Sequence, residues 1–273
     1  MRTSTRMVVL SKRFDTDAQT YITAVEATDG APLEEGVKIA INNFVVGCKA
    51  DGIWSAIKAS CILAGARTLA GALVPLAGTA PTNFNFVSGD YNRKTGLVGD
   101  GTTKYLDSNR NNNADPQDSC HISVYGTAFG ATTAAVKVPL GRQINGFNQK
   151  ALFASTSINS GLLTVRCQST NAPVAHTANR ADGLIGTSRA NSGTISIRNS
   201  NSTVTASQVS TAPSTPTLFV FASSDGNPGN NGGIASAFDD SCLAFYSIGE
   251  SLNLALLDTR ITTLINTYNT AIA

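Results

Sequence analysis

Carboxylates and histidines, the side chains that most often carry acid–base chemistry, are unevenly placed in this chain of 273 residues. The four glutamates are Glu26, Glu34, Glu35 and Glu250. No glutamate lies between Gly36 and Gly249, although a glycosidase needs two facing carboxyl groups, one of them acting as an acid. The two histidines, His121 and His176, lie in no recognisable nucleophile motif. We therefore expect that the protein is not an enzyme.

A stretch rich in aspartate and asparagine offers the best candidate for an ion site. Its oxygen-bearing side chains recur at every second position, at Asp107, Asn109, Asn111, Asn113 and Asp115. This spacing resembles a calcium-binding loop, but Asn112 stands where such a loop needs glycine and Asp118 where it needs a bidentate glutamate. A turn that bonds its own backbone explains the same residues. We favour the turn, and we expect no metal and no other cofactor.

Two tyrosines near a basic turn are the best-placed residues for contacting a sugar. Tyr91 and Tyr105 flank the segment that contains Arg93, and aromatic rings with a polar end suit half-exposed binding surfaces. These three residues form the candidate glycan-binding set. The alternative is that the tyrosines only hold a hairpin in place.

Charge and cysteine usage exclude several classes of function. A net charge of +2 is too small for a dedicated nucleic-acid binder. Between Cys120 and Ser224, seven basic residues stand against the single acid Asp182. This imbalance indicates either an interface with an acidic partner or scattered surface cations.

The five cysteines show neither a CxxC motif nor a histidine at metal-ligand spacing, so we interpret them as small buried residues of a protein that folds in a reducing cytoplasm.

Three patterns follow one another along the chain and define the elements that must position these residues. From Asp15 to about Leu69 apolar residues recur at helical spacing. From about Leu73 to Tyr246 short apolar or alternating runs are separated by turn residues, which predicts an antiparallel sandwich. One apolar stripe then marks a final helix, at Leu257, Ile261, Leu264, Ile265 and Tyr268. The predicted parts are residues 1–72, 73–250 and 251–273.

Neither a secretory signal nor a membrane span is predicted. Only Met7 to Leu10 is apolar before Lys12, which is too short for a signal peptide. The most apolar stretch, from Cys61 to Ala80, contains an arginine and a proline, so we expect a buried helix followed by an extended segment.

Three segments resemble a known family. Gly96 to Asp107 is similar to the opening strand pair of concanavalin-like, laminin-G-type jelly rolls found in phage proteins, and Leu243 to Leu252 is similar to their last strand. Gly47 to Trp54 resembles the helical preface of such proteins. The resemblance implies a mainly β fold, an antiparallel jelly-roll sandwich with an N-terminal helical subdomain and a C-terminal helix. It also implies a virion component of the tail, baseplate or fibre, or one that decorates the head.

We therefore expect a non-enzymatic phage structural protein that assembles through its helical parts. The stripe of the final helix would lie against the sandwich, the N-terminal helices or a neighbouring subunit. The helical parts would contact other virion proteins or further copies of the chain in a homo-oligomer. The alternative is a carbohydrate-binding module on a tail fibre that recognises a host surface glycan. In both cases the protein would be made in the host cytoplasm and carried in the virion.

Overall fold

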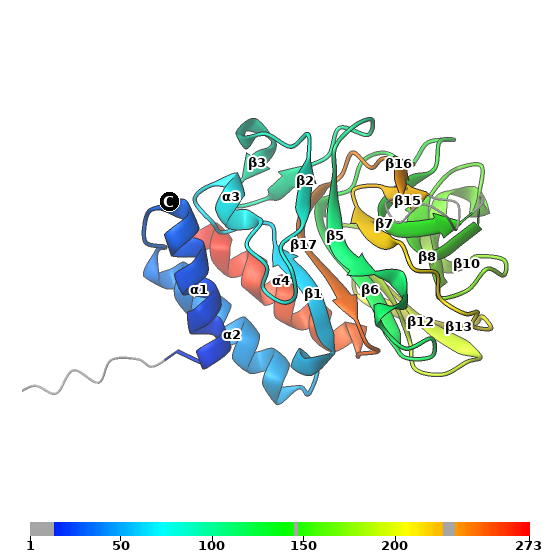
Figure 1. Cartoon of the computed structure of the whole chain (residues 1–273), viewed down its shortest axis with the longest axis horizontal. Coiled ribbons are helices and arrows are strands. Elements are labelled where there is room, and N and C mark those ends of the chain that lie inside the picture. The colour runs from blue at the N-terminus through cyan, green and yellow to red at the C-terminus, as the bar shows by residue number, and fades with distance from the viewer. Residues whose placement is uncertain (1–13, 145–146, 226–232) are drawn as a thin grey trace, which may run out of the picture.

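A computed structural model describes residues 14–144, 147–225 and 233–273, and it shows three layers: helices, sheet A and sheet B (Figure 1). The described residues contain four α-helices, α1 (Thr16–Asp29), α2 (Glu35–Ala50), α3 (Leu69–Ala72) and α4 (Leu254–Ala271). Within the described part of the chain, no helix is long and apolar enough to cross a lipid bilayer.

Local sequence signals explain where the long helices begin and end. The Asp15 carboxylate accepts a hydrogen bond from the Asp17 backbone N–H and caps α1, which stops at Gly30 in the left-handed conformation. The Asn253 side chain caps α4 by accepting from the Ala255 backbone N–H at 3.0 Å. The prediction of helices at both ends of the chain is confirmed.

Sheet A is antiparallel and lies between the helices and sheet B. Its strands, in spatial order, are β13 (Ser202–Ser207), β12 (Thr194–Asn199), β11 (Gly183–Arg189), β6 (Cys120–Ala128), β17 (Cys242–Gly249), β4 (Gly96–Val98) and β3 (Tyr91–Asn92). β1 (Ile57–Ile62) continues the β4 side of β17, so β17 has partners along both edges and is buried throughout. This strand is the centre of the sheet.

Sheet B faces sheet A and completes the sandwich. Its strands, in spatial order, are β10 (Val174–Asn179), β9 (Leu162–Cys167), β8 (Phe147–Ala154), β7 (Lys137–Ile144), β14 (Thr217–Val220), β5 (Tyr105–Asn111) and β2 (Thr82–Phe84). β15 (Ser223–Asp225) runs parallel to β7 and pairs with β16 (Ile234–Ser236). The prediction of a mainly β, antiparallel sandwich with helical additions is thus confirmed, whereas its jelly-roll topology stays a prediction.

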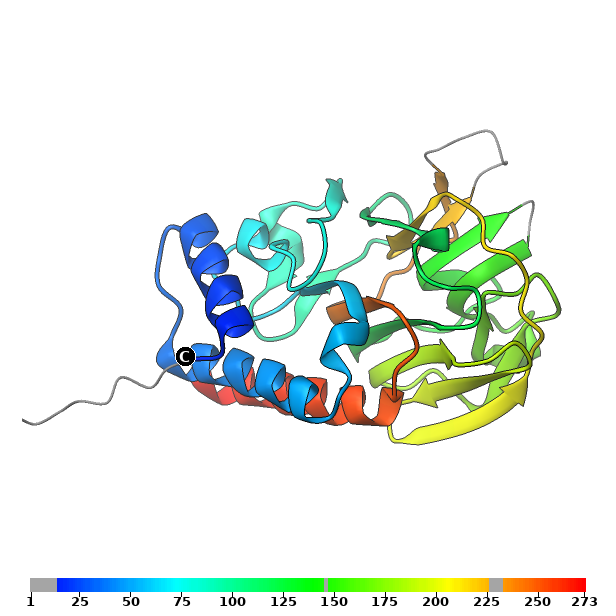
Figure 2. The same cartoon turned by 60° about the horizontal axis from the view of Figure 1, so that its bottom comes forward.

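Two hydrophobic cores hold the layers together. One core fills the space between the sheets, and the other joins the helices to the outer face of sheet A. In the second core, Phe245 of β17 meets Phe44 of α2 edge to face, with ring centres 5.9 Å apart. α2 and α4 lie side by side over the sheet (Figure 2, blue and red). The helical layer is therefore made from both ends of the chain.

The apolar stripe of α4 faces this second core, between the helices and sheet A. Its members, Leu257, Ile261, Leu264, Ile265 and Tyr268, are at most 3% exposed. They pack against residues of α2 and sheet A in their own chain. Of the surfaces expected for this stripe, the structure therefore shows the N-terminal helices and the sandwich of the same chain, and it leaves these five side chains buried rather than open to a neighbouring subunit.

One segment differs from its predicted secondary structure. Helical spacing was expected to continue beyond Ile53, but Ile57–Ile62 forms strand β1. The predicted buried helix between Cys61 and Ala80 is reduced to the four residues of α3. Cys61 pairs with Tyr246 of β17, and a strand buried on both faces carries apolar residues without a period of two. Periodicity alone cannot separate such a strand from a buried helix.

The basic residues of the sandwich are used inside the molecule. Arg142, Lys150 and Arg189 are fully buried. Three further cations form ion pairs with acids, namely Lys137 with Asp240, Arg180 with Asp239 and Arg198 with Asp258. Since Asp239, Asp240 and Asp258 follow the basic stretch in the sequence, folding neutralises the local excess of positive charge. The positive surface considered for an acidic partner is therefore largely absent.

Candidate functional site

Tyr91 and Arg93 connect β3 to the helical layer. The Tyr91 hydroxyl donates to the Ala66 carbonyl at 2.8 Å, and Arg93 Nε donates to the same oxygen at 2.9 Å. The Arg93 guanidinium also donates to both carboxylate oxygens of Glu34, at 3.0 and 2.7 Å. This contact lowers the pKa of Glu34 to about 2. The polar groups predicted to meet a glycan are thus engaged in holding the layers together.

Tyr105 lies elsewhere, on the outer face of sheet B. Its ring stacks on Phe84 with centres 4.4 Å apart and contacts Phe219 at 4.7 Å. Phe84 is 37% exposed, whereas Phe219 is buried. The structure therefore does not bring the three predicted glycan-binding residues together.

The side chains of the candidate calcium loop do not converge on one point, because they contact different parts of the chain. The Asp107 carboxylate accepts from the Thr217 hydroxyl at 3.0 Å, and the Asn109 amide donates to the Ala80 carbonyl at 2.8 Å. Asn111 and Asn113 are exposed. The described residues contain no group of three side chains placed to hold a metal. Asp107, Asn109 and Asn111 belong to strand β5 and not to the turn that the sequence favoured. The Asn109 backbone N–H still donates to the Asp107 carboxylate at 2.9 Å, as such a turn would have it.

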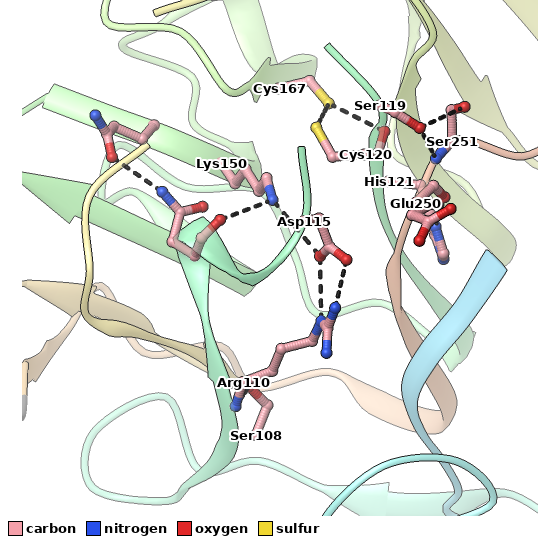
Figure 3. A network of polar contacts seen from close by, with 12 residues as sticks. Ser108, Arg110, Asp115, Ser119, Cys120, His121, Lys150, Cys167, Glu250 and Ser251 are labelled. Atoms are coloured by element: carbon pink, nitrogen blue, oxygen red, sulfur yellow. Dashed lines mark hydrogen bonds and ion pairs between the residues drawn. The ribbon is translucent and has the colours of Figure 1, made fainter. Parts of the chain in front are cut away.

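Asp115, the last residue of that series, belongs to a buried polar network. Its carboxylate accepts from the Arg110 guanidinium and lies 4.0 Å from Lys150 Nζ (Figure 3). Lys150 Nζ also donates to the Asn112 carbonyl at 3.2 Å. The protein's own cations therefore surround the carboxylate that a calcium ion would need.

His121 lies beside this network as a neutral structural residue. Its Nδ1–H donates to the Glu250 carbonyl at 2.5 Å, and its Nε2 accepts from the Ser247 hydroxyl at 2.8 Å. Burial lowers the pKa of His121 from 6.5 to about 4. Its hydrogen bonds leave no ring nitrogen free for catalysis.

The depressed pKa of His121 predicts loss of stability in mild acid. Because the folded-state pKa lies below 6.5, the unfolded chain binds the proton first, and the stabilisation present above pH 6.5 is lost as the pH falls to about 4. The difference between 6.5 and 4 corresponds to about 3 kcal/mol. Melting temperatures measured across this pH range should fall less steeply for His121→Gln than for the unaltered protein. Equal slopes would contradict this origin of the pH dependence.

A polar pocket of about 430 Å³ lies between sheet A and α4. Five separate segments supply its lining: Lys94 and Thr95, Tyr125 to Thr127, Asp182 and Gly183, Ser200 and Asn201, and the residues Asp258, Thr262, Ile265, Asn266 and Asn269 of α4. This volume is in the range of small-molecule sites.

Fixed hydrogen bonds hold the walls of the pocket. The Thr127 hydroxyl donates to the Thr95 carbonyl at 2.6 Å, and the Asp182 carboxylate accepts from the Phe129 backbone N–H at 2.9 Å. On α4, Asp258 forms an ion pair with Arg198 at 2.7 Å. The walls are therefore positioned by contacts that leave the interior groups free.

Several polar groups that line the pocket have no protein partner. Within the described part of the chain, no hydrogen bond involves Lys94 Nζ, the Tyr125 hydroxyl, or the side-chain amides of Asn201, Asn266 and Asn269. Together they offer donors from the ammonium, donors and acceptors from the amides, and a hydroxyl that does both. These donors and acceptors match the hydrogen-bonding groups of a small ligand that carries many hydroxyl groups.

A second cavity, of about 380 Å³, lies between α1 and the segment that follows Trp54. The Trp54 indole N–H donates to Asp17 at 3.0 Å, and the Lys49 ammonium lies 5.9 Å from the ring centre. Apolar side chains supply much of the remaining lining, including Ile57 and Leu76. This cavity offers fewer free polar groups than the pocket beside α4.

The spacing of polar residues on α4 is a sequence signal for the pocket, and it belongs to none of the candidate motifs above. Asp258, Thr262, Asn266 and Asn269 recur at three- and four-residue spacing, so they share one face of α4 next to its apolar stripe. The other lining segments show no pattern of their own, because each contributes only two or three residues.

Comparisons with known proteins identify no family. No family model and no curated protein matches the chain. Among solved structures, a Trypanosoma rangeli sialidase in complex with difluorosialic acid is 8% identical, with 91% of this chain and 38% of that chain covered and a TM-score of 0.47. The binding domain of botulinum neurotoxin serotype D is 12% identical, with 76% and 51% covered and a TM-score of 0.47. The chain thus spans at most about half of these proteins.

An enzymatic domain of a phage protein also appears among the matches. The enzymatically active domain of tailspike protein 2 from bacteriophage CBA120 is 15% identical, with 70% of this chain and 30% of that chain covered and a TM-score of 0.36. The expectation that the chain is not an enzyme is contradicted, since sialidases and this domain are among the structures that it matches. At these similarities, the matches transfer no activity to this chain.

Proposed function

We propose that this chain is a carbohydrate-binding domain of a bacteriophage virion protein, built as a jelly-roll sandwich of the concanavalin-like type. Its pocket between sheet A and α4 holds a sugar residue of a host surface glycan. The observation that carries the proposal is the set of polar side chains in that pocket that have no hydrogen-bond partner among the described residues.

The chemistry of these groups matches a polyhydroxylated ligand. A sugar presents neighbouring hydroxyl groups that both donate and accept, and the amides of Asn201, Asn266 and Asn269 can answer both roles. The Asp182 carboxylate adds an acceptor and Lys94 adds a donor. A site built to hydrogen-bond hydroxyl groups strongly rejects ligands that lack them, which favours a specific glycan over an apolar ligand.

The virion assignment comes from the resemblance of three segments to phage proteins and completes the proposal. The domain is made in the host cytoplasm and is carried in the particle, where it contacts other virion proteins and further copies of itself. In this arrangement the pocket faces outward and the buried stripe of α4 stays within its own chain.

Substitutions in the pocket test the proposal directly. The full-length protein is applied to an array of bacterial surface polysaccharides, and its affinity for each bound glycan is then measured by titration calorimetry. Asn266→Ala and Asn201→Ala should each weaken binding about tenfold, because each removes hydrogen bonds worth about 1.4 kcal/mol.

Asn113→Ala is the matched control, since Asn113 is exposed in the short 3₁₀ helix Asn112–Ala114, outside the pocket. This variant should bind as tightly as the unaltered protein. The proposal is wrong if no glycan binds, or if both pocket variants retain full affinity.

A further inference from the structure

Two cysteines from opposite sheets lie in direct contact. Cys120 begins β6 in sheet A and Cys167 ends β9 in sheet B, and their sulfur atoms are 3.6 Å apart (Figure 3). Both residues are fully buried. A disulfide bond is about 2.05 Å long, so the two sulfur atoms need to approach by only about 1.5 Å to form one.

The other three cysteines are placed differently. Cys61 accepts a hydrogen bond from the Tyr246 hydroxyl at 3.5 Å, and the Cys242 thiol donates to the Thr95 carbonyl at 3.2 Å. Burial raises the pKa of both Cys48 and Cys61 to about 12. The thiols of Cys48 and Cys61 therefore resist conversion to thiolates. Among the five cysteines, Cys120 and Cys167 are the two whose sulfur atoms are in contact.

The surroundings of Cys120 favour its thiolate. A hydrogen bond from the Cys167 thiol lowers the pKa of Cys120, and the positive charges of Lys150 and Arg189 add to this effect. Both cations are fully buried. The thiolate is the reactive form of cysteine, so Cys120 is the nucleophile of the pair and Cys167 resolves the intermediate.

We propose that Cys120 and Cys167 are a modification site, at which hydrogen peroxide produces a disulfide bond that joins the two sheets. The oxidant must be small because both sulfur atoms are inaccessible to solvent. This inference goes beyond the proposed function and does not depend on it.

The reaction balances with one molecule of peroxide. The Cys120 thiolate attacks one peroxide oxygen, so that an S–O bond forms, the O–O bond breaks and hydroxide leaves, giving a sulfenic acid. The Cys167 sulfur then attacks the Cys120 sulfur, so that the S–S bond forms, the S–O bond breaks and a second hydroxide leaves. The two thiol protons end on the two hydroxides as water. Two thiols are oxidised and the peroxide is reduced.

The bond would stabilise the sandwich. It closes a loop between residues 120 and 167 and restricts the unfolded chain, an effect that grows with loop length. It also links a strand beside the central β17 to sheet B, where β9 pairs with β8. Oxidation should therefore raise the melting temperature, and reduction should reverse the change.

The test uses the full-length reduced protein before and after treatment with hydrogen peroxide. The protein is then unfolded, alkylated and examined by intact mass and peptide mapping. We expect two of the five cysteines to escape alkylation, leaving three, together with a cross-linked peptide that joins Cys120 to Cys167. The melting temperature should rise by about 5–10 °C and return to its starting value with dithiothreitol.

Single substitutions separate this pair from the other thiols. Cys242→Ser should keep both the cross-link and the rise in melting temperature, whereas Cys120→Ser and Cys167→Ser should lose both. The inference is overturned if all five cysteines of the treated, unaltered protein are alkylated, or if Cys120 is oxidised to the sulfinic acid without a cross-link. The number of alkylated cysteines and the oxidation state of Cys120 are both measured on the unaltered protein, so this test does not require any variant to fold.

Discussion

Replacing Asp115 with alanine should lower the free energy of unfolding by about 3–5 kcal/mol, because the change leaves the buried Lys150 and the partly buried Arg110 without their counter-charge. Asp115 is 2% exposed and Lys150 is fully buried. The Arg110 guanidinium donates to the same carboxylate. Denaturant unfolding followed by far-UV circular dichroism measures the change.

A double substitution shows whether the unpaired positive charge causes this loss of stability. Asp115→Ala combined with Lys150→Met removes one of the two cations together with the carboxylate, so the pair should cost less than the sum of the single changes. A loss below about 1 kcal/mol for Asp115→Ala alone would mean that water reaches these cations.

Phe245→Ala should also cost about 3–5 kcal/mol, because it leaves a cavity where the helical layer meets sheet A. Phe245 is fully buried and meets Phe44 of α2. Trp54 is the only tryptophan and lies between α2 and β1. Its fluorescence therefore reports on the helical layer, whereas far-UV circular dichroism reports on the secondary structure of the whole molecule.

The two signals test whether the helices and the sandwich unfold together. We expect coincident transitions in the unaltered protein, and coincident transitions at lower denaturant concentration in Phe245→Ala. If the Trp54 signal changes first, the helical layer unfolds separately from the sandwich. Phe84→Ala is a suitable comparison, because Phe84 is 37% exposed and should cost less.

Elements with strong local signals were predictable from the sequence. The caps at Asp15 and Asn253 and the spacing of apolar residues locate α1 and α4. The alternation from Ile195 to Thr205 likewise predicts the hairpin of β12 and β13, which turns at Ser200. Strand β1 was missed because its neighbour β17 lies nearly two hundred residues away, as the pairing of Cys61 with Tyr246 shows. Pairing between distant segments overrides local periodicity here.

The candidate site was harder to predict than the fold. Tyr91 and Arg93 are suitable residues for binding, but their partners Ala66 and Glu34 come from other parts of the chain. The pocket beside α4 is assembled from five segments between Lys94 and Asn269. Whether a polar side chain is free to bind a ligand depends on hydrogen-bond partners that are distant in the sequence. A local sequence pattern contains no information about those partners.

The position of β17 in sheet A has a consequence for synthesis on the ribosome. Residues 242–249 pair with β1, β4 and β6, all of which are translated much earlier. Until β17 emerges, these strands lack their shared partner, and α2 lacks α4. Until then the apolar residues of these segments lack their native cover, and exposed apolar surface with unpaired strand edges makes a chain prone to aggregate.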